Sequence, residues 1–110
     1  MSSNVALMGI AGRDCYTAAK GGVAALTRSM AVEFAPQRVR VNAFAPSATM
    51  TERVRKLVAG NAALTRLADA YLLGLIEPGD IANMALFLAF DESRMVTGQV
   101  YPVDSGVTIS

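Results

Sequence analysis

The sequence predicts an α/β fold in which helices flank a parallel sheet, and four segments of the chain carry this prediction. Residues Asp14–Ala35 place apolar side chains at spacings of three and four, which is typical of an amphipathic helix. Arg38–Ala45 alternates and then becomes wholly apolar, as a buried parallel strand does. Ile81–Phe90 predicts a further helix, and Val100–Val103 predicts a short last strand. At 110 residues the chain is long enough for one domain and too short for two.

The first residues predict the entry into the long helix. Ser2–Val5 reads as the end of a strand, and Ala6–Arg13 reads as a loop because it contains two glycines. Pro36 ends the helix that follows. The apolar face of that helix is formed by Val23, Leu26, Met30 and Phe34.

Two further helices are expected between the strands, at Thr51–Val58 and Ala62–Leu73. Asp80 lies in a turn and can cap the next helix. That helix, Ile81–Phe90, is apolar nearly all round, so we expect it to be buried. After the last strand, Asp104-Ser105-Gly106 turns the chain away from the sheet.

The composition excludes several classes of protein. Hydrophobic residues make up 53% and charged residues 17% of the chain, which is not the composition of a disordered protein. The net charge of +1 and the scattered basic residues argue against a nucleic-acid partner. The apolar runs are too short for a membrane span, so we expect no membrane partner. One cysteine fits a reducing cytoplasm, and the lack of histidine excludes most zinc sites, so we expect no metal.

Ser3, Tyr16 and Lys20 form a candidate catalytic set. Tyr16 and Lys20 are one helical turn apart and share a face of the predicted helix. A nearby positive charge lowers the pKa of a phenol, which then exchanges a proton with a carbonyl or alcohol oxygen more readily. Ser3 could hold the same oxygen. The alternatives are a surface pair on one helix face and an ordinary turn serine.

A second candidate segment runs from Pro46 to Thr51, after the predicted strand. It places backbone amides and hydroxyl groups at the carboxyl end of a parallel strand, where ligands of open α/β sheets bind. The alternative is an ordinary loop between strand and helix, with Thr51 as the N-cap. Thr51 could serve both purposes.

Taken together, these segments resemble the short-chain dehydrogenase/reductase family. The resemblance rests on Ser3, on Tyr16-x3-Lys20 in a helix with many small residues, on RVRVNAFAP, and on the tail PGDIANMALFLAFDESRMVTGQVYPVDSG. These motifs occur in the family's order and spacing and cover essentially the whole chain. The resemblance implies a Rossmann-type parallel sheet with flanking helices, incomplete because the N-terminal cofactor-binding half is absent. Residues 1–110 would be the C-terminal part of a single domain.

The resemblance also implies an activity and the roles of seven residues. The activity is hydride transfer between NAD or NADP and a small alcohol or ketone, with Tyr16 as the general acid/base. Lys20 would assist Tyr16 and bind the nicotinamide ribose, and Ser3 would orient the substrate oxygen. Cofactor contacts are implied for Tyr16, Lys20, Pro46, Ser47, Thr49 and Thr51.

The sequence departs from the family's pattern at several positions. Ser47 stands where a glycine is usual, Ser105 replaces the first glycine of the tail, and Ala6 replaces a glycine near the catalytic serine. The glycine-rich phosphate loop and the residue that selects between NAD and NADP have no counterpart in this sequence. We therefore expect weak activity or none from these residues alone, and the choice between NAD and NADP stays open.

Two functions remain open from sequence. The first is an oxidoreductase. The second is a non-catalytic module that acts only in oligomerisation, because the family forms dimers and tetramers through surfaces that this chain retains. The apolar residues of Glu52–Ile76 fit either a cover over a hydrophobic substrate or a cover over the core, and we favour the core.

Overall fold

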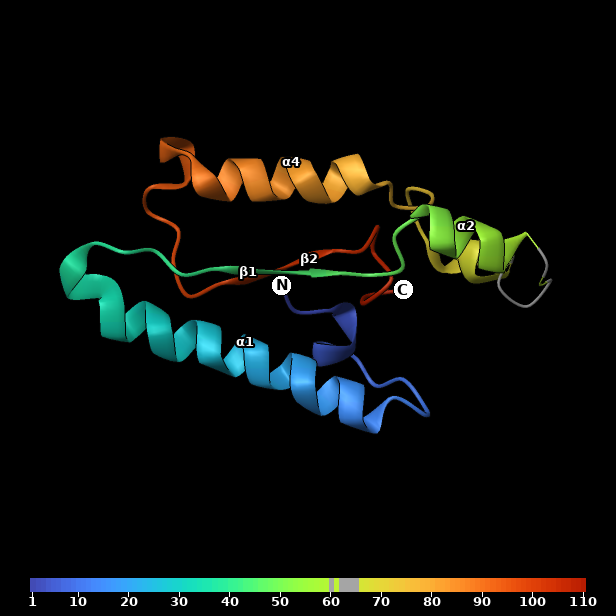
Figure 1. Ribbon diagram of the computed structural model, residues 1–110, viewed down its shortest axis with the longest axis horizontal. Helices are drawn as coiled ribbons and strands as arrows, with labels where there is room; N and C mark the ends of the chain where they lie inside the picture. The colour runs from blue at the N-terminus through green and yellow to red at the C-terminus, as the bar shows by residue number, and fades with distance from the viewer. Residues whose placement is uncertain (60, 62–65) are drawn as a thin grey trace.

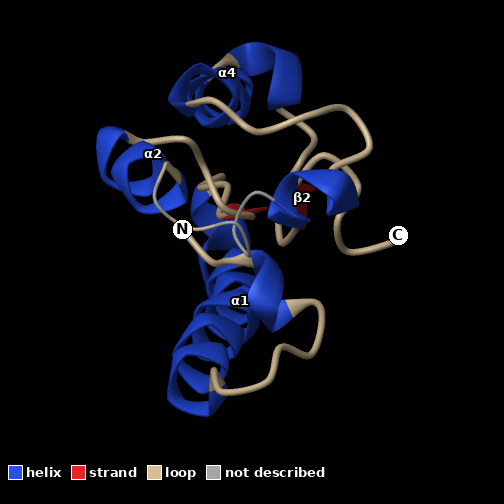
Figure 2. Cartoon of the chain, turned by 90° about the vertical axis from the view of Figure 1, so that its right-hand side faces the viewer, coloured by secondary structure: helices blue, strands red, loops and turns tan. Residues whose placement is uncertain are grey.

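The computed structural model describes residues 1–59, 61 and 66–110. Strands β1 (Ala43–Pro46) and β2 (Val100–Val103) pair in parallel, with Ala43 opposite Val100 and Pro46 opposite Val103. Helix α1 (Asp14–Phe34) lies on one side of this sheet and helix α4 (Pro78–Ala89) on the other (Figures 1 and 2). Three layers of this kind confirm the predicted incomplete α/β fold with a parallel sheet.

The N-terminal segment runs beside β1. The backbone N–H of Ser2 donates to the carbonyl oxygen of Phe44 at 2.9 Å, and Ser3 is extended with φ −159° and ψ 158°. The expected strand end over Ser2–Val5 is wrong beyond Ser3, because the 3₁₀ helix η1 (Asn4–Ala6) turns the chain there. The sharp turn leaves the side chains of residues 3 and 4 at the end of the sheet.

Helix α1 matches the prediction to within one residue at its C-terminal end. It packs through small buried side chains, Ala24, Thr27 and Ala31. A Cβ added at Gly98 would lie 3.4 Å from the Ala31 Cβ, and Gly98 has a φ of +73°. A glycine therefore suits both the backbone conformation and the close approach of the last loop to the helix. Pro36 lies in the 3₁₀ helix η2 (Ala35–Gln37), which follows α1 directly.

The segment between the strands begins with α2 (Glu52–Val58), which agrees with the first of the two expected helices. The second, expected over Ala62–Leu73, falls partly on residues 62–65, which lie outside the described residues. Its remaining part is a 3₁₀ helix, η3 (Arg66–Ala70), followed by a turn, so an α-helix over that part is wrong. Tyr71 is buried there, as a cover over the core requires, whereas Leu72 is exposed.

Helix α4 begins at Pro78 with Glu77 as its N-cap. The Asp80 carboxylate accepts a hydrogen bond from the backbone N–H of Glu77 at 2.8 Å, so Asp80 caps the helix from its first turn. The expectation that this helix is buried is wrong, since no residue of α4 is buried and Leu86 and Phe90 are 57% and 56% exposed. The two-stranded sheet covers one side of α4, and the described residues leave its other side open.

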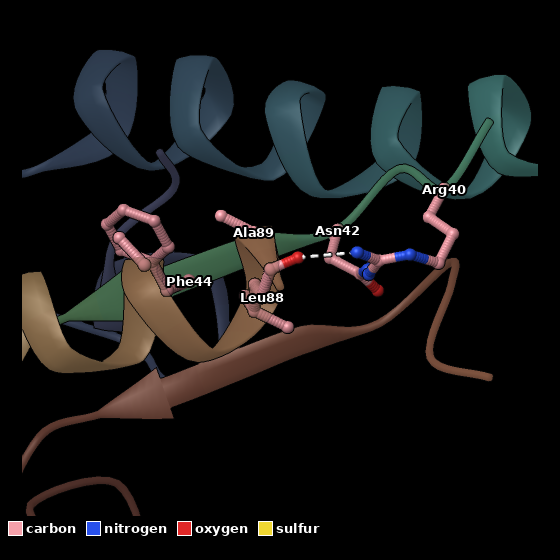
Figure 3. Close-up of a pocket in the computed structure, with 6 residues that line it drawn as sticks. Arg40, Asn42, Phe44, Leu88 and Ala89 are labelled. Carbon is pink, nitrogen blue, oxygen red and sulfur yellow. Dashed lines mark hydrogen bonds between the residues drawn. The ribbon is translucent and has the colours of Figure 1, made fainter. Parts of the chain in front are cut away.

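Arg40 joins the entry of β1 to the end of α4. Its guanidinium donates to the carbonyl oxygen of Leu88 at 2.8 Å (Figure 3). It also donates to the hydroxyl of Ser93 at 3.0 Å. Carbonyl groups at a helix C-terminus attract a cation, so this side chain stabilises the end of α4. Arg40 and Asn42 also line a small pocket of about 250 Å³ between the sheet and α4. Because the Arg40 guanidinium already has several partners within the chain, we assign it a structural role.

Among the described residues, no helix is both long and apolar enough to cross a lipid bilayer.

Candidate active site

A pocket of about 750 Å³, larger than the one beside Arg40, lies at the carboxyl end of β1. Its wall combines the N-terminal segment and η1, the start of α1, the loop after β1, and the C-terminal residues. These segments are far apart in sequence, and the parallel sheet brings them to one edge. Pockets of this size and position are typical of ligand sites in open α/β folds.

Two of the three predicted catalytic residues line this pocket directly. Ser3 is buried and follows the segment beside β1, whereas Tyr16 is 46% exposed in the first turn of α1. The Ser3 hydroxyl donates to Asn4 Oδ1 at 3.2 Å and lies 3.5 Å from the carbonyl oxygen of Pro46. Both distances are long for a hydroxyl donor, so the Ser3 hydroxyl can donate its hydrogen bond to a better-placed acceptor instead.

Lys20 lies beside Tyr16 rather than on the pocket wall. Its Nζ atom is 5.5 Å from the centroid of the Tyr16 ring, and it donates to the carbonyl oxygen of Met1 at 3.3 Å. The hydroxyl of Ser2 donates to the backbone carbonyl of Lys20 at 2.9 Å. This bond fixes the N-terminal segment, and with it Ser3, against the helix turn that carries the lysine.

The loop after β1 supplies three of the predicted cofactor residues to the pocket, namely Pro46, Ser47 and Thr49. Thr51 does not line it. Its side chain instead accepts a hydrogen bond from the backbone N–H of Val54 at 3.4 Å, so Thr51 caps α2 as the alternative expected. Among the described residues, the backbone N–H of Thr49 has no acceptor, although Thr49 lies on the pocket wall.

Sequence reasoning missed a buried polar network behind this loop. The side-chain amide of Asn4 donates to the Ser47 hydroxyl at 3.1 Å, and that hydroxyl is 2.7 Å from the hydroxyl of Tyr71. The Tyr71 hydroxyl also accepts from the backbone N–H of Ala48 at 3.1 Å. Asn4 and Tyr71 are both buried. The sequence does hold one signal for this network, which is a tyrosine within a leucine-rich run. Such a tyrosine is expected to be buried, and a buried tyrosine hydroxyl needs a hydrogen-bond partner.

The C-terminal turn is held by Asp104, which is buried. Burial raises the pKa of this carboxyl, but hydrogen bonds outweigh it and hold the pKa of Asp104 below its usual value. Gly106 N–H donates to one carboxylate oxygen at 3.1 Å, and Thr108 donates to the other through its backbone at 2.9 Å and through its hydroxyl. The turn places Val107 and Ser110 on the pocket wall.

Ser105, where the family pattern has glycine, has a φ of +53°. This left-handed conformation costs a residue with a Cβ about 1 kcal/mol. Two bonds offset the cost, because the carbonyl of Ser105 accepts from Leu72 N–H and its hydroxyl accepts from Leu73 N–H, both at 2.8 Å. A side chain at Gly106 would not be accommodated in the same way, because an added Cβ would lie 2.6 Å from Leu72 Cδ1.

The residues present fit the nicotinamide end of a dinucleotide. A carboxamide and a ribose present both donors and acceptors, and the pocket offers the unpaired Thr49 N–H, the Tyr16 hydroxyl and the nearby Lys20 ammonium. A strongly bound pyrophosphate would need a glycine-rich loop before a helix, and this sequence has none.

Comparison with known proteins supports the same family. A family model described as "Enoyl-(Acyl carrier protein) reductase" matches residues 1–108. The 3-oxoacyl-[acyl-carrier-protein] reductase of Thermotoga maritima is 41% identical, and the match covers 99% of this chain and 44% of that protein.

Solved structures agree closely in fold. A short-chain type dehydrogenase/reductase from Mycobacterium ulcerans has a TM-score of 0.91 at 32% identity, covering 98% of this chain and 40% of its own. A 4-hydroxyisoleucine dehydrogenase mutant in complex with NADH and succinate has a TM-score of 0.90 at 31% identity. The match covers 99% of this chain and 45% of the dehydrogenase chain. ElxO with NADP bound has a TM-score of 0.91 at 30% identity, again with 99% and 45% covered.

The chain spans less than half the length of the relatives that it matches. Over that length the fold agrees with theirs, and structures of this fold hold NADH or NADP. The chain belongs to the short-chain dehydrogenase/reductase family.

Proposed function

We propose that this chain carries the substrate-side chemistry of an NAD(P)-dependent oxidoreductase that interconverts a ketone and a secondary alcohol. The observation that supports it best is one pocket lined by both Ser3 and Tyr16, with the Lys20 ammonium 5.5 Å from the centroid of the Tyr16 ring. A phenol near a cation, beside a second hydroxyl, is suited to proton exchange with a carbonyl oxygen.

Each residue has a distinct role in this proposal. The Ser3 hydroxyl donates a hydrogen bond to the substrate oxygen, in place of its long bond to Asn4. In ketone reduction Tyr16 gives its proton to that oxygen, and in alcohol oxidation the Tyr16 phenolate takes the proton back. The ammonium of Lys20, 5.5 Å from the centroid of the Tyr16 ring, would stabilise the negative charge that develops on the Tyr16 oxygen as the proton leaves. A bound NAD(P) cofactor would supply the hydride to the carbonyl carbon in reduction and would accept it from the alcohol carbon in oxidation.

The nicotinamide end would be held by the loop after β1 and by the first turns of α1. Thr49 would use its backbone N–H, and Pro46 and Ser47 would form the adjacent wall. Tyr16 and Lys20 would bind the ribose hydroxyls. Thr51 would act indirectly, by fixing the start of α2 and thereby the end of this loop.

The decisive test is a chimera, because these residues supply no phosphate loop. The part of the Thermotoga maritima reductase that precedes the matched segment is joined to this chain, and ketone reduction is followed with NADH and with NADPH. Changing Tyr16→Phe should lower kcat at least ~100-fold, the low end for loss of acid–base catalysis. Tyr101→Phe is the matched control, since Tyr101 lies in β2 outside the pocket and should leave kcat unchanged.

Near-normal turnover by the Tyr16→Phe chimera would exclude Tyr16 as the acid/base. A cofactor titration of the 110-residue chain tests the alternative of a purely associative module. No change in nicotinamide fluorescence with the chain alone, and a clear change with the chimera, would assign the chemistry to these residues and the anchoring to the added part. Binding without turnover in the chimera would favour the associative module.

Assembly into a dimer or tetramer and a cytoplasmic location complete the proposal. Support for assembly comes from apolar side chains that stand exposed on the outer side of α4 and on α1, including Phe87, Phe90 and Val32. Support for the cytoplasm comes from the single, unpaired Cys15. Sedimentation of the chain at several concentrations tests the assembly, and a monomer at all of them would contradict it.

A further inference from the structure

The active-site pocket has an uneven distribution of charge. Its wall is mostly apolar or hydroxylic, with Val5, Met8 and Ile10 beside the hydroxyls of Ser3 and Tyr16. Arg13 is the only lining residue in the described part of the chain whose side chain is charged. One cationic side chain among uncharged ones is a strong specificity element, because no other lining side chain of the described residues can pair with a ligand's charge.

Arg13 has no structural partner that explains its position. Within the described residues, no carboxylate lies within 4.0 Å of its guanidinium, and its side chain forms no hydrogen bond. The guanidiniums of Arg40 and Arg55 bind groups of the chain, and the other described arginines without a partner, such as Arg28, lie outside the pocket. Arg13 also precedes the first residue of α1, where the helix dipole disfavours a cation, so it does not stabilise that helix.

We propose that Arg13 binds an anionic group of the substrate, so that the substrate class is a ketone or secondary alcohol with a carboxylate or similar anion. This inference rests on the proposed function. Arg13 is three residues before Tyr16, about one helical turn, and both line the same pocket. A small molecule therefore reaches the guanidinium with its anion and Tyr16 with its carbonyl oxygen. The apolar wall contacts the carbon chain between them.

The test measures binding of a matched pair of ligands to the 110-residue chain by NMR titration. The pair is 5-oxohexanoate and its neutral amide, 5-oxohexanamide. We expect the carboxylate to bind roughly tenfold more tightly at low salt, as one charge-assisted pair provides. Because Arg13 is exposed, added salt should weaken this preference.

Substitutions show whether the preference for the carboxylate depends on Arg13 itself or only on the net charge of the chain. Arg13→Gln should abolish the preference for the carboxylate, and Arg13→Lys should retain part of it. Arg28→Gln removes the same charge from an exposed position of α1 outside the pocket and should leave the preference intact. Equal binding of acid and amide, or an equal effect of the Arg13→Gln and Arg28→Gln changes, would overturn the proposal.

The binding test is independent of turnover. If the chimera is inactive but the chain prefers the carboxylate through Arg13, the proposed catalytic function fails and the anion site stands. If the chimera reduces neutral ketones as well as their carboxylate analogues, the anion site fails and the catalytic function stands.

Discussion

Removing the hydroxyl of Tyr71 tests whether the network behind the pocket holds the loop after β1. In Tyr71→Phe, the Ala48 N–H loses its acceptor and the Ser47 hydroxyl loses its partner at 2.7 Å. The aromatic ring stays, so the buried apolar area hardly changes. The effect is therefore confined to two hydrogen bonds and to the polar groups that they leave behind.

The expected magnitude follows from those two bonds. A net contribution of about 1 kcal/mol for each gives a loss of about 2 kcal/mol in the free energy of unfolding. For a chain of this size, that loss corresponds to a fall in Tm of roughly 8–15 °C. Ser47 keeps its bond from Asn4, so the loss should not exceed this range greatly.

Urea denaturation at one fixed protein concentration measures this loss, because association of the chain would otherwise add a concentration-dependent contribution. Hydrogen exchange at the Ala48 amide reports the same bond locally and should become faster in the variant. Tyr101→Phe is the control, since the Tyr101 hydroxyl forms no hydrogen bond with a described residue. A Tyr71→Phe variant no less stable than the Tyr101→Phe control, with unchanged exchange at Ala48, would refute the reasoning.

Two further substitutions test other supports of the fold. Asp104→Asn should cost about 1 kcal/mol at neutral pH through loss of the charge-assisted bonds from Thr108. Because the pKa of Asp104 is lowered in the folded chain, its carboxylate stabilises the fold at pH values above the unfolded pKa of about 3.9. This stabilisation is lost as the pH falls through the folded pKa. Urea midpoints of parent and variant should therefore converge below about pH 4, and a gap independent of pH would contradict this. Arg40→Met should cost about 2 kcal/mol by leaving the Leu88 carbonyl and the Ser93 hydroxyl without this donor, and Arg28→Met, measured in the same way, should cost almost nothing.

Much of the fold was predictable because it depends on local periodicity. The spacing of apolar residues located α1 to within one residue. The strand expected over Arg38–Ala45 was right only at its apolar end, because β1 covers Ala43–Pro46 and the chain before Ala43 is not strand. The burial of α4 was not predictable in the same way. An apolar pattern shows which faces need cover, but it does not show how many elements of the same chain are present to cover them.

The candidate site was predictable where a motif fixes residues on one element. Tyr16 and Lys20 lie together because four residues make one helical turn. The network through Asn4, Ser47 and Tyr71 was not, because it joins three segments whose sequence separations carry no period. The strand expected over Ser2–Val5 failed for a related reason. Its pairing with β1 ends where η1 begins, and no residue pattern marks that point.

The contacts around Tyr71 explain how the chain tolerates serine at two positions where the family pattern has glycine. Ser105 carries the strain of a left-handed conformation, but its carbonyl and hydroxyl bind the N–H groups of Leu72 and Leu73, next to Tyr71. Tyr71 in turn binds the hydroxyl of Ser47. The two serines therefore hold the same segment, Ser47 at the Tyr71 hydroxyl and Ser105 at the backbone of the next two residues.

This arrangement predicts that the two positions are energetically coupled. Residues within one hydrogen-bond network commonly show coupling of 0.5 kcal/mol or more, whereas distant residues add independently. Changing Ser105→Gly should relieve the strain but release Leu73, which leaves Tyr71 less firmly placed against Ser47. In a double-mutant cycle, the stabilising effect of the Ser47 hydroxyl should therefore be smaller in the Ser105→Gly background. Strict additivity would show instead that each serine is tolerated for local reasons alone.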